Sequence, residues 1–112
     1  MSISNPNYSN IDHAEMAKAI GLKEKFIPML IGSFLEESNP IIEKLEDAIK
    51  SKDFTQIRSH AHSIKGSAGN LKFNEIYEMA REMELSATDG DDNFDYTSYL
   101  EAIKTAISTI PN

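Results

Sequence analysis

The chain has 112 residues, enough for one domain around a single core, and we treat residues 1–112 as that domain. It contains no cysteine, which excludes disulfides and thiolate metal sites, and its 18 acidic against 11 basic residues give a net charge of -7 that repels nucleic acid and anionic lipid. The polar lead over about residues 1–10 is unlike a signal peptide, and no apolar run is long enough to span a bilayer. We therefore expect a soluble cytoplasmic protein that binds neither nucleic acid nor membrane.

Helical periodicity runs through almost the whole chain, and no stretch shows the strict alternation typical of strands, so the predicted fold class is all-α. A short first helix is expected between a cap at Asn10 or Asp12 and a stop at Gly21. Its apolar positions are Ile11, Ala14, Ala17 and Ile20.

The longest helix is predicted from Lys23 to about Lys50. Its apolar residues recur at spacings of three, four and seven, which indicates one buried face. These residues are Phe26, Leu30, Phe34, Ile41, Leu45 and Ala48. Pro40 falls inside this span, where it either kinks the helix or begins a new one. We favour a kink, because the apolar stripe keeps its phase across the proline.

The third predicted helix opens at Asp53, which is followed three positions later by Gln56 in the pattern of a capping box, and it ends at about Asn70. Its apolar positions are Phe54, Ile57, Ala61, Ile64 and Ala68. Asn74 is predicted to cap the fourth helix, which ends before the turn-rich loop 89–93. The apolar positions of that fourth helix are Ile76, Met79, Ala80 and Met83.

The last helix is predicted from about Asp95 to Thr109, with Pro111 beyond it. Its apolar positions are Tyr96, Leu100, Ile103 and Ile107. Four long amphipathic helices with short connections predict an antiparallel four-helix bundle, to which the short first helix is an N-terminal addition.

The stretch HAHSIKGSAGNL, residues 60–71, places histidines and glycines within the third helix. Measured around the helix axis from His62, Lys65 lies about 60° to one side, Gly66 about 40° to the other, and Gly69 about 20° away. These residues therefore share a face at the edge of the core stripe or outside it. His60 lies about 200° away, across the helix.

This geometry excludes some uses of a histidine. His60 and His62 diverge on a helix and so do not share a metal ion. The segment from Gly66 to Gly69 lacks the spacing of a phosphate-binding loop. A hydrolytic triad needs a nucleophile and an orienting acid, neither of which the sequence places near His62. Nucleophilic attack by the imidazole itself stays open.

Ordinary structural roles are the alternative for each of these residues. A surface histidine is usually only solvated, and Lys65 could be a plain solvated charge. Each glycine costs about 0.5–1 kcal/mol relative to Ala inside a helix, which argues for a role beside His62. Close packing of a neighbouring helix is the other explanation for both glycines, and Gly69 could simply end the helix. We assign no functional role to His13 or His60.

The segment AHSIKGSAGNL, from Ala61 to Leu71, resembles the signature of the histidine-containing phosphotransfer (HPt) domains, Ala-His-x-Leu/Ile-Lys-Gly followed by small residues and a Leu. The resemblance extends over roughly the whole chain, because that family has a short leading helix and an antiparallel four-helix bundle. The chain departs from the family pattern after Leu71, where Lys72 and Phe73 replace the usual glycine and small residue.

The resemblance implies that His62 is the phosphorylated nucleophile, that Lys65 stabilises the charge of the phosphoryl group, and that Gly66 gives the partner access. It implies a phosphocarrier of a two-component phosphorelay rather than a metabolic enzyme. The partners are the receiver domains of hybrid sensor kinases and response regulators, which bring their own Mg²⁺, so that the chain itself, expected as a monomer, needs no cofactor or metal. The alternatives are a helical interaction module that docks receivers without carrying phosphate, and a helical hydrolase that uses His62.

Overall fold

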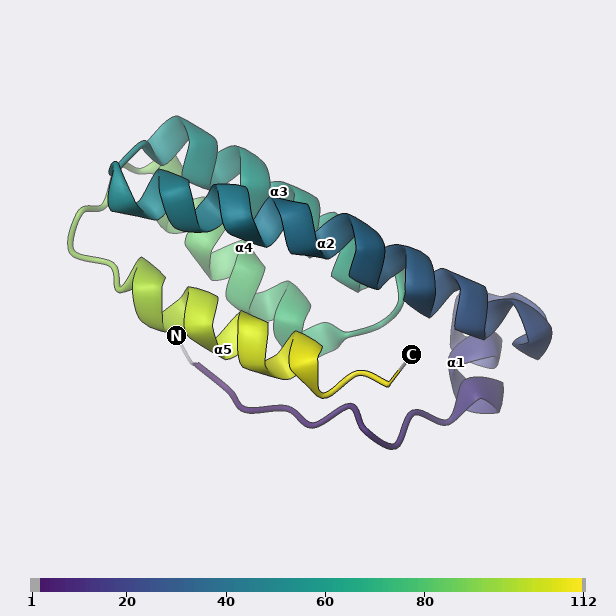
Figure 1. The fold of residues 1–112 in the computed structure, drawn as a ribbon. Coiled ribbons are helices and arrows are strands. Elements are labelled where there is room, and N and C mark those ends of the chain that lie inside the picture. Colours follow the sequence, from purple (N-terminus) through teal and green to yellow (C-terminus); the bar gives the residue numbers. More distant parts are fainter. Residues whose placement is uncertain (1–2, 112) are drawn as a thin grey trace.

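All regular structure in the computed structural model, which describes residues 3–111, is helical (Figure 1). The elements are α1 (His13–Ile20), the 3-10 turn η1 (Glu24–Phe26), α2 (Ile27–Lys50), α3 (Phe54–Asn70), α4 (Asn74–Thr88) and α5 (Tyr96–Ser108). The prediction of an all-α fold is confirmed. Within the described part of the chain, no helix combines the length and the apolar character that crossing a membrane requires.

Helices α2 to α5 pack around one core, in a molecule that measures 42 × 24 × 21 Å. α3 packs against both α2 and α4, and α5 contacts α2 and α4 from the other side. α1 lies beside the N-terminal end of α2, and the lead that precedes it runs along α5 (Figure 1). Tyr8 fastens this lead, since its N–H donates to Thr109 Oγ1 at 2.9 Å and its hydroxyl donates to Glu75 Oε1 at 2.7 Å.

Aspartate side chains begin three of the helices, as expected for residues that accept hydrogen bonds from exposed N–H groups. Asp12 accepts from the N–H of Glu15, and Asp53 accepts from that of Gln56. Asp95 does the same for α5 through the N–H of Ser98. The predicted caps at Asp12 and Asp53 are thereby confirmed, and Gly21 ends α1 in the left-handed conformation as predicted, with φ 84°.

The predicted cap at Asn74 is wrong, because Asn74 is already the first residue of α4 and Phe73 precedes it as the cap, with no side-chain bond. Phe73 is buried, and its ring packs against those of Tyr8 and Phe34. The burial of an aromatic side chain therefore fixes the entry into α4, in place of a polar cap.

The buried face of η1 and α2 is shifted by one residue, in three places, from the stripe predicted for a single helix over residues 23–50. Phe26 is 40% exposed, and Leu30 and Ile41 are only half-buried, whereas the residues that follow each of them are in the core. These core residues are Ile27, Ile31 and Ile42. Each site is a pair of adjacent apolar residues, and periodicity alone does not decide which member of a pair faces inward.

The other apolar predictions hold with four exceptions. Phe34, Leu45 and Ala48 of α2 are buried, and so are all four predicted positions in each of α4 and α5. Ala14 is exposed, and Ile11, Ile20 and Phe54 are half-buried. α2 continues through Pro40, so a new helix does not begin there.

Candidate functional site

The core stripe of α3 fixes how this helix is rotated and therefore where His62 points. Ile57, Ala61, Ile64 and Ala68 are buried, and the cap at Asp53 sets the start of the helix. His62 follows Ala61 and is turned about 100° out of the core. Its side chain is 65% exposed, as the sequence predicted for an imidazole outside the core stripe.

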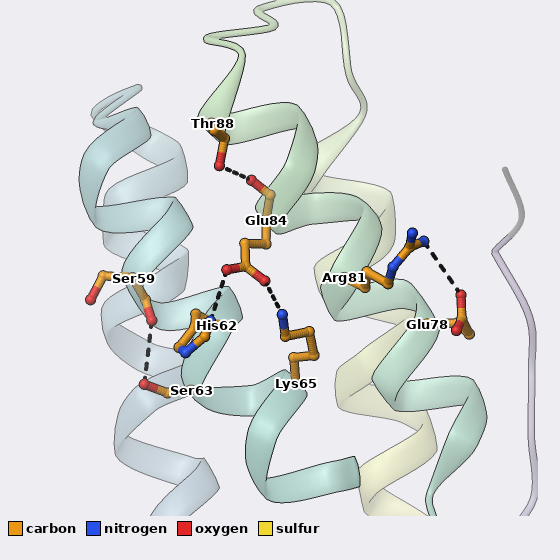
Figure 2. Close-up of polar contacts among 8 residues, drawn as sticks. All are labelled: Ser59, His62, Ser63, Lys65, Glu78, Arg81, Glu84 and Thr88. Atoms are coloured by element: carbon orange, nitrogen blue, oxygen red, sulfur yellow. Dashed lines mark hydrogen bonds and ion pairs between the residues drawn. The ribbon is translucent and has the colours of Figure 1, made fainter.

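A carboxylate from the neighbouring helix lies between His62 and Lys65. Glu84 of α4 places its Oε2 2.8 Å from His62 Nδ1 and its Oε1 2.7 Å from Lys65 Nζ (Figure 2). Met83, the residue before Glu84, is buried, which leaves Glu84 at the edge of α4 that faces α3. The three side chains form one unit, which we call the His62–Glu84–Lys65 cluster.

Glu84 is ionised at neutral pH. Burial raises the pKa of this carboxyl group, but the hydrogen bonds and charges of Lys65 and His62 outweigh that effect, so its pKa lies below the usual value. An ionised carboxylate has no proton to donate. The hydrogen bond at 2.8 Å therefore requires the proton to reside on His62 Nδ1.

With the proton on Nδ1, the lone pair of the neutral ring lies on Nε2. Nε2 points away from Glu84 (Figure 2). The arrangement can thus hold an exposed imidazole in one tautomer and one orientation, with a nitrogen lone pair available for nucleophilic attack.

The surface beside this ring is made of small residues. A Cβ atom added at Gly66 would meet no atom within 4 Å, and Ser59 and Ser63 are exposed on the same side of α3. The Ser63 hydroxyl donates to the Ser59 carbonyl at 3.3 Å rather than to His62 (Figure 2). Gly66 therefore leaves open space next to the imidazole, and the nearest hydroxyl in the sequence is not arranged as a nucleophile.

Gly69 has a different environment, because it packs against α4. A Cβ atom there would lie 3.1 Å from Tyr77 Cδ2, closer than ordinary van der Waals contact. The alternative of close helix packing therefore holds for Gly69. The idea that Gly69 ends the helix is wrong, since α3 continues to Asn70.

The turn after α3 explains how the chain accommodates Lys72 and Phe73. Lys72 takes the left-handed conformation with φ 62°, which glycine adopts more easily. The N–H of Phe73 donates to the Ala68 carbonyl at 3.0 Å and that of Lys72 to the Gly69 carbonyl at 3.2 Å, as in a Schellman motif. These bonds and the burial of Phe73 offset the strain at Lys72.

The other histidines lie away from this cluster. His60 is half-buried and lines an open hollow of about 480 Å³ at the far end of α2, together with Lys44 and Asp47. His13 belongs to α1. Within residues 3–111, no group of three or more His, Cys, Asp or Glu side chains is placed to hold a metal ion.

The sequence predictions missed Glu84. α4 carries Glu75, Glu78, Glu82 and Glu84, and only the packing of α4 on α3 selects which of them meets His62. The buried neighbour Met83 places Glu84 near the helix edge, but that signal does not give the register between two helices. By contrast, the structure does bring the predicted residues His62, Lys65 and Gly66 onto one surface.

Comparison with known proteins gives one match. The family model described as Hpt domain matches residues 29–110, which is most of the chain and contains all of the cluster. No curated protein and no solved structure matches.

Proposed function

The chain belongs to the Hpt domain family, whose members are histidine phosphotransfer modules of phosphorelays, and on that premise we propose that His62 carries the phosphoryl group. In this proposal the protein relays phosphate from the receiver aspartate of a hybrid sensor kinase to that of a response regulator. α2 to α5 serve as the antiparallel four-helix bundle of the carrier, and α1 is its short leading helix. The carrier works in the cytoplasm as a monomer.

The observation that supports this proposal best is the hydrogen bond between His62 Nδ1 and Glu84. It leaves the Nε2 lone pair exposed on a ring whose side chain is 65% accessible, beside the open space at Gly66. A nucleophile held on an exposed helix face suits a macromolecular phosphodonor, which brings the rest of the reaction centre with it.

The transfer step needs no proton to move. The Nε2 lone pair attacks the phosphorus of a receiver acyl phosphate, an N–P bond forms, and the P–O bond to the aspartate breaks as its carboxylate leaves. Phosphoryl transfer depends chiefly on in-line positioning and on neutralisation of charge, and the receiver supplies Mg²⁺ and a lysine of its own. Return to a second receiver is the reverse reaction. The family resemblance assigns Lys65 to stabilising the charge of the phosphoryl group, and its ammonium group lies in the same cluster as the ring.

Phosphorylation of the purified protein tests this proposal. The chain is incubated with a phosphorylated receiver domain and Mg²⁺, and the protein is then assayed for phosphate that is labile in acid and stable in base. Such label on His62 is the expected result. Stable binding of receivers without any label would instead establish the docking module, and turnover of a small substrate would establish a hydrolase.

A further inference from the structure

The charge of Lys65 is already engaged in the unphosphorylated protein. Its Nζ lies 2.7 Å from Glu84 Oε1, and both side chains are largely covered, with 23% of Lys65 and 18% of Glu84 exposed. Lys65 therefore lies in a short ion pair that is shielded from solvent, and its ammonium group is not a free surface charge.

Glu84 orients the imidazole of His62, but its negative charge opposes the transfer reaction. Its oxygen fixes the Nδ1–H tautomer, but an uncompensated carboxylate would repel an approaching phosphoryl group. The loose transition state of phosphoryl transfer builds little charge on the attacking nitrogen, so the negative charge of Glu84 gains little there in return.

We propose, on the premise that His62 carries the phosphoryl group, that Lys65 is a positioning residue which acts through Glu84. Its ammonium group cancels the charge of the carboxylate that orients His62, so that the ring keeps its hydrogen-bond acceptor while the incoming phosphoryl group meets a neutral pair. The rival mechanism is direct contact between Lys65 and the phosphoryl oxygens.

A double substitution separates the two mechanisms. Lys65→Met keeps most of the buried stem but leaves Glu84 uncompensated, and transfer from a phosphorylated receiver is expected to slow about tenfold. Adding Glu84→Gln removes the uncompensated negative charge, and the amide oxygen of the new side chain can still accept a hydrogen bond from His62 Nδ1–H. Lys65→Met/Glu84→Gln is therefore expected to recover to within about threefold of the wild-type rate.

The Glu84→Gln substitution is tested together with Lys65→Met, because Lys65 would change the orientation of the new amide group. In Glu84→Gln alone, the ammonium of Lys65 would attract the amide oxygen and turn the NH₂ group towards His62, which favours the wrong tautomer. Tautomers of the neutral ring are read from the ¹⁵N resonances of the imidazole, without any phosphate. The proton is expected on Nδ1 in the wild type and in Lys65→Met, and a proton on Nε2 in the wild type would overturn the proposal.

The chain offers a control for net charge in the pair of Lys104 and Glu46, which joins α5 to α2 at 3.9 Å and lies outside the cluster; Glu46 also pairs with Lys50, and Lys104 also pairs with Glu101. Lys104→Met and Lys104→Met/Glu46→Gln change the net charge in the same way and are expected to transfer at the wild-type rate. An equal effect at this pair would overturn the proposal, because it would show that total charge alone matters.

The transfer rates of the single and double variants decide between the two mechanisms. A double variant as slow as Lys65→Met overturns the proposal in favour of direct contact with the phosphoryl group. A wild-type rate in Lys65→Met overturns both mechanisms. If the wild-type protein takes no label, the phosphotransfer function fails and this inference fails with it. That result differs from a labelled wild type without rescue, which refutes the inference alone.

Discussion

Two glycines lie on one face of α3, and they have different surroundings. Gly66 lies beside the exposed ring of His62, where an added Cβ would meet no atom within 4 Å. Gly69 faces α4, where an added Cβ would lie 3.1 Å from the Tyr77 ring. One glycine opens a surface and the other lets two helices approach, which shows that the same residue type in one helix can serve access or packing.

The largest effect is expected at His62, and His60 is its control on the other side of the same helix. His62→Gln removes the nucleophile and is expected to abolish labelling by a phosphorylated receiver. His60→Gln is expected to accept label like the wild type, because His60 lies across the helix in the hollow near α2. Label that persists in His62→Gln, or disappears in His60→Gln, would contradict the assignment.

Gly66→Gln tests whether the open space at the exposed edge is used. The side chain points to solvent and improves helix propensity, so the domain is expected to be at least as stable as the wild type. The added bulk beside the ring would keep a receiver from reaching in-line geometry, and we expect transfer to fall by about tenfold or more. Transfer rate and thermal midpoint are measured together. Full-rate transfer would show that the receiver does not approach over Gly66.

Replacing each glycine with alanine tests the difference between the open and the packed glycine through the free energy of unfolding. Gly66→Ala is expected to stabilise the domain by about 0.5–1 kcal/mol through helix propensity alone. At Gly69 the new methyl group would press on Tyr77 at 3.1 Å, so Gly69→Ala is expected to gain about 0.5–1 kcal/mol less. Urea unfolding of both variants gives the difference, and equal gains would mean that the Tyr77 ring moves aside without cost.

The smallest effect concerns the pH dependence of stability through Glu84. The pKa of this carboxyl is lowered in the folded protein from an ordinary value of 4.5, so its contribution is complete above about pH 4.5 and is lost as the pH falls through the lowered value. The stability advantage of the wild type over Glu84→Gln is therefore expected to shrink by about 1 kcal/mol or less between pH 7 and pH 3. Urea unfolding at both pH values measures this, and an unchanged difference would argue against an ionised Glu84 in the cluster.

The sequence predicted the helices well because their signals are local. Asp53 and Gly21 act through hydrogen bonds and backbone angles within a few residues, and the buried stripe of α3 follows from the helical repeat. The predictions failed where local signals are ambiguous or absent. Phe26 and Ile27 are both apolar and adjacent, so only the position of the neighbouring helices selected Ile27 for the core. Asn74 has the right chemistry for a cap, but the burial of Phe73 set the start of α4.

The sequence by itself determined that His62 of α3 points away from the core and that Lys65 and Gly66 lie next to it. His62, Lys65 and Gly66 share a face because they are close in one helix with a fixed repeat. Only the tertiary structure decided that Glu84 joins them, since its distance from His62 depends on the register of α4 against α3, set by the packing of many side chains. Packing likewise decided that there is open space beside Gly66 and that Gly69 lies against the Tyr77 ring, because the space next to a glycine is defined by the atoms of other helices and not by the glycine.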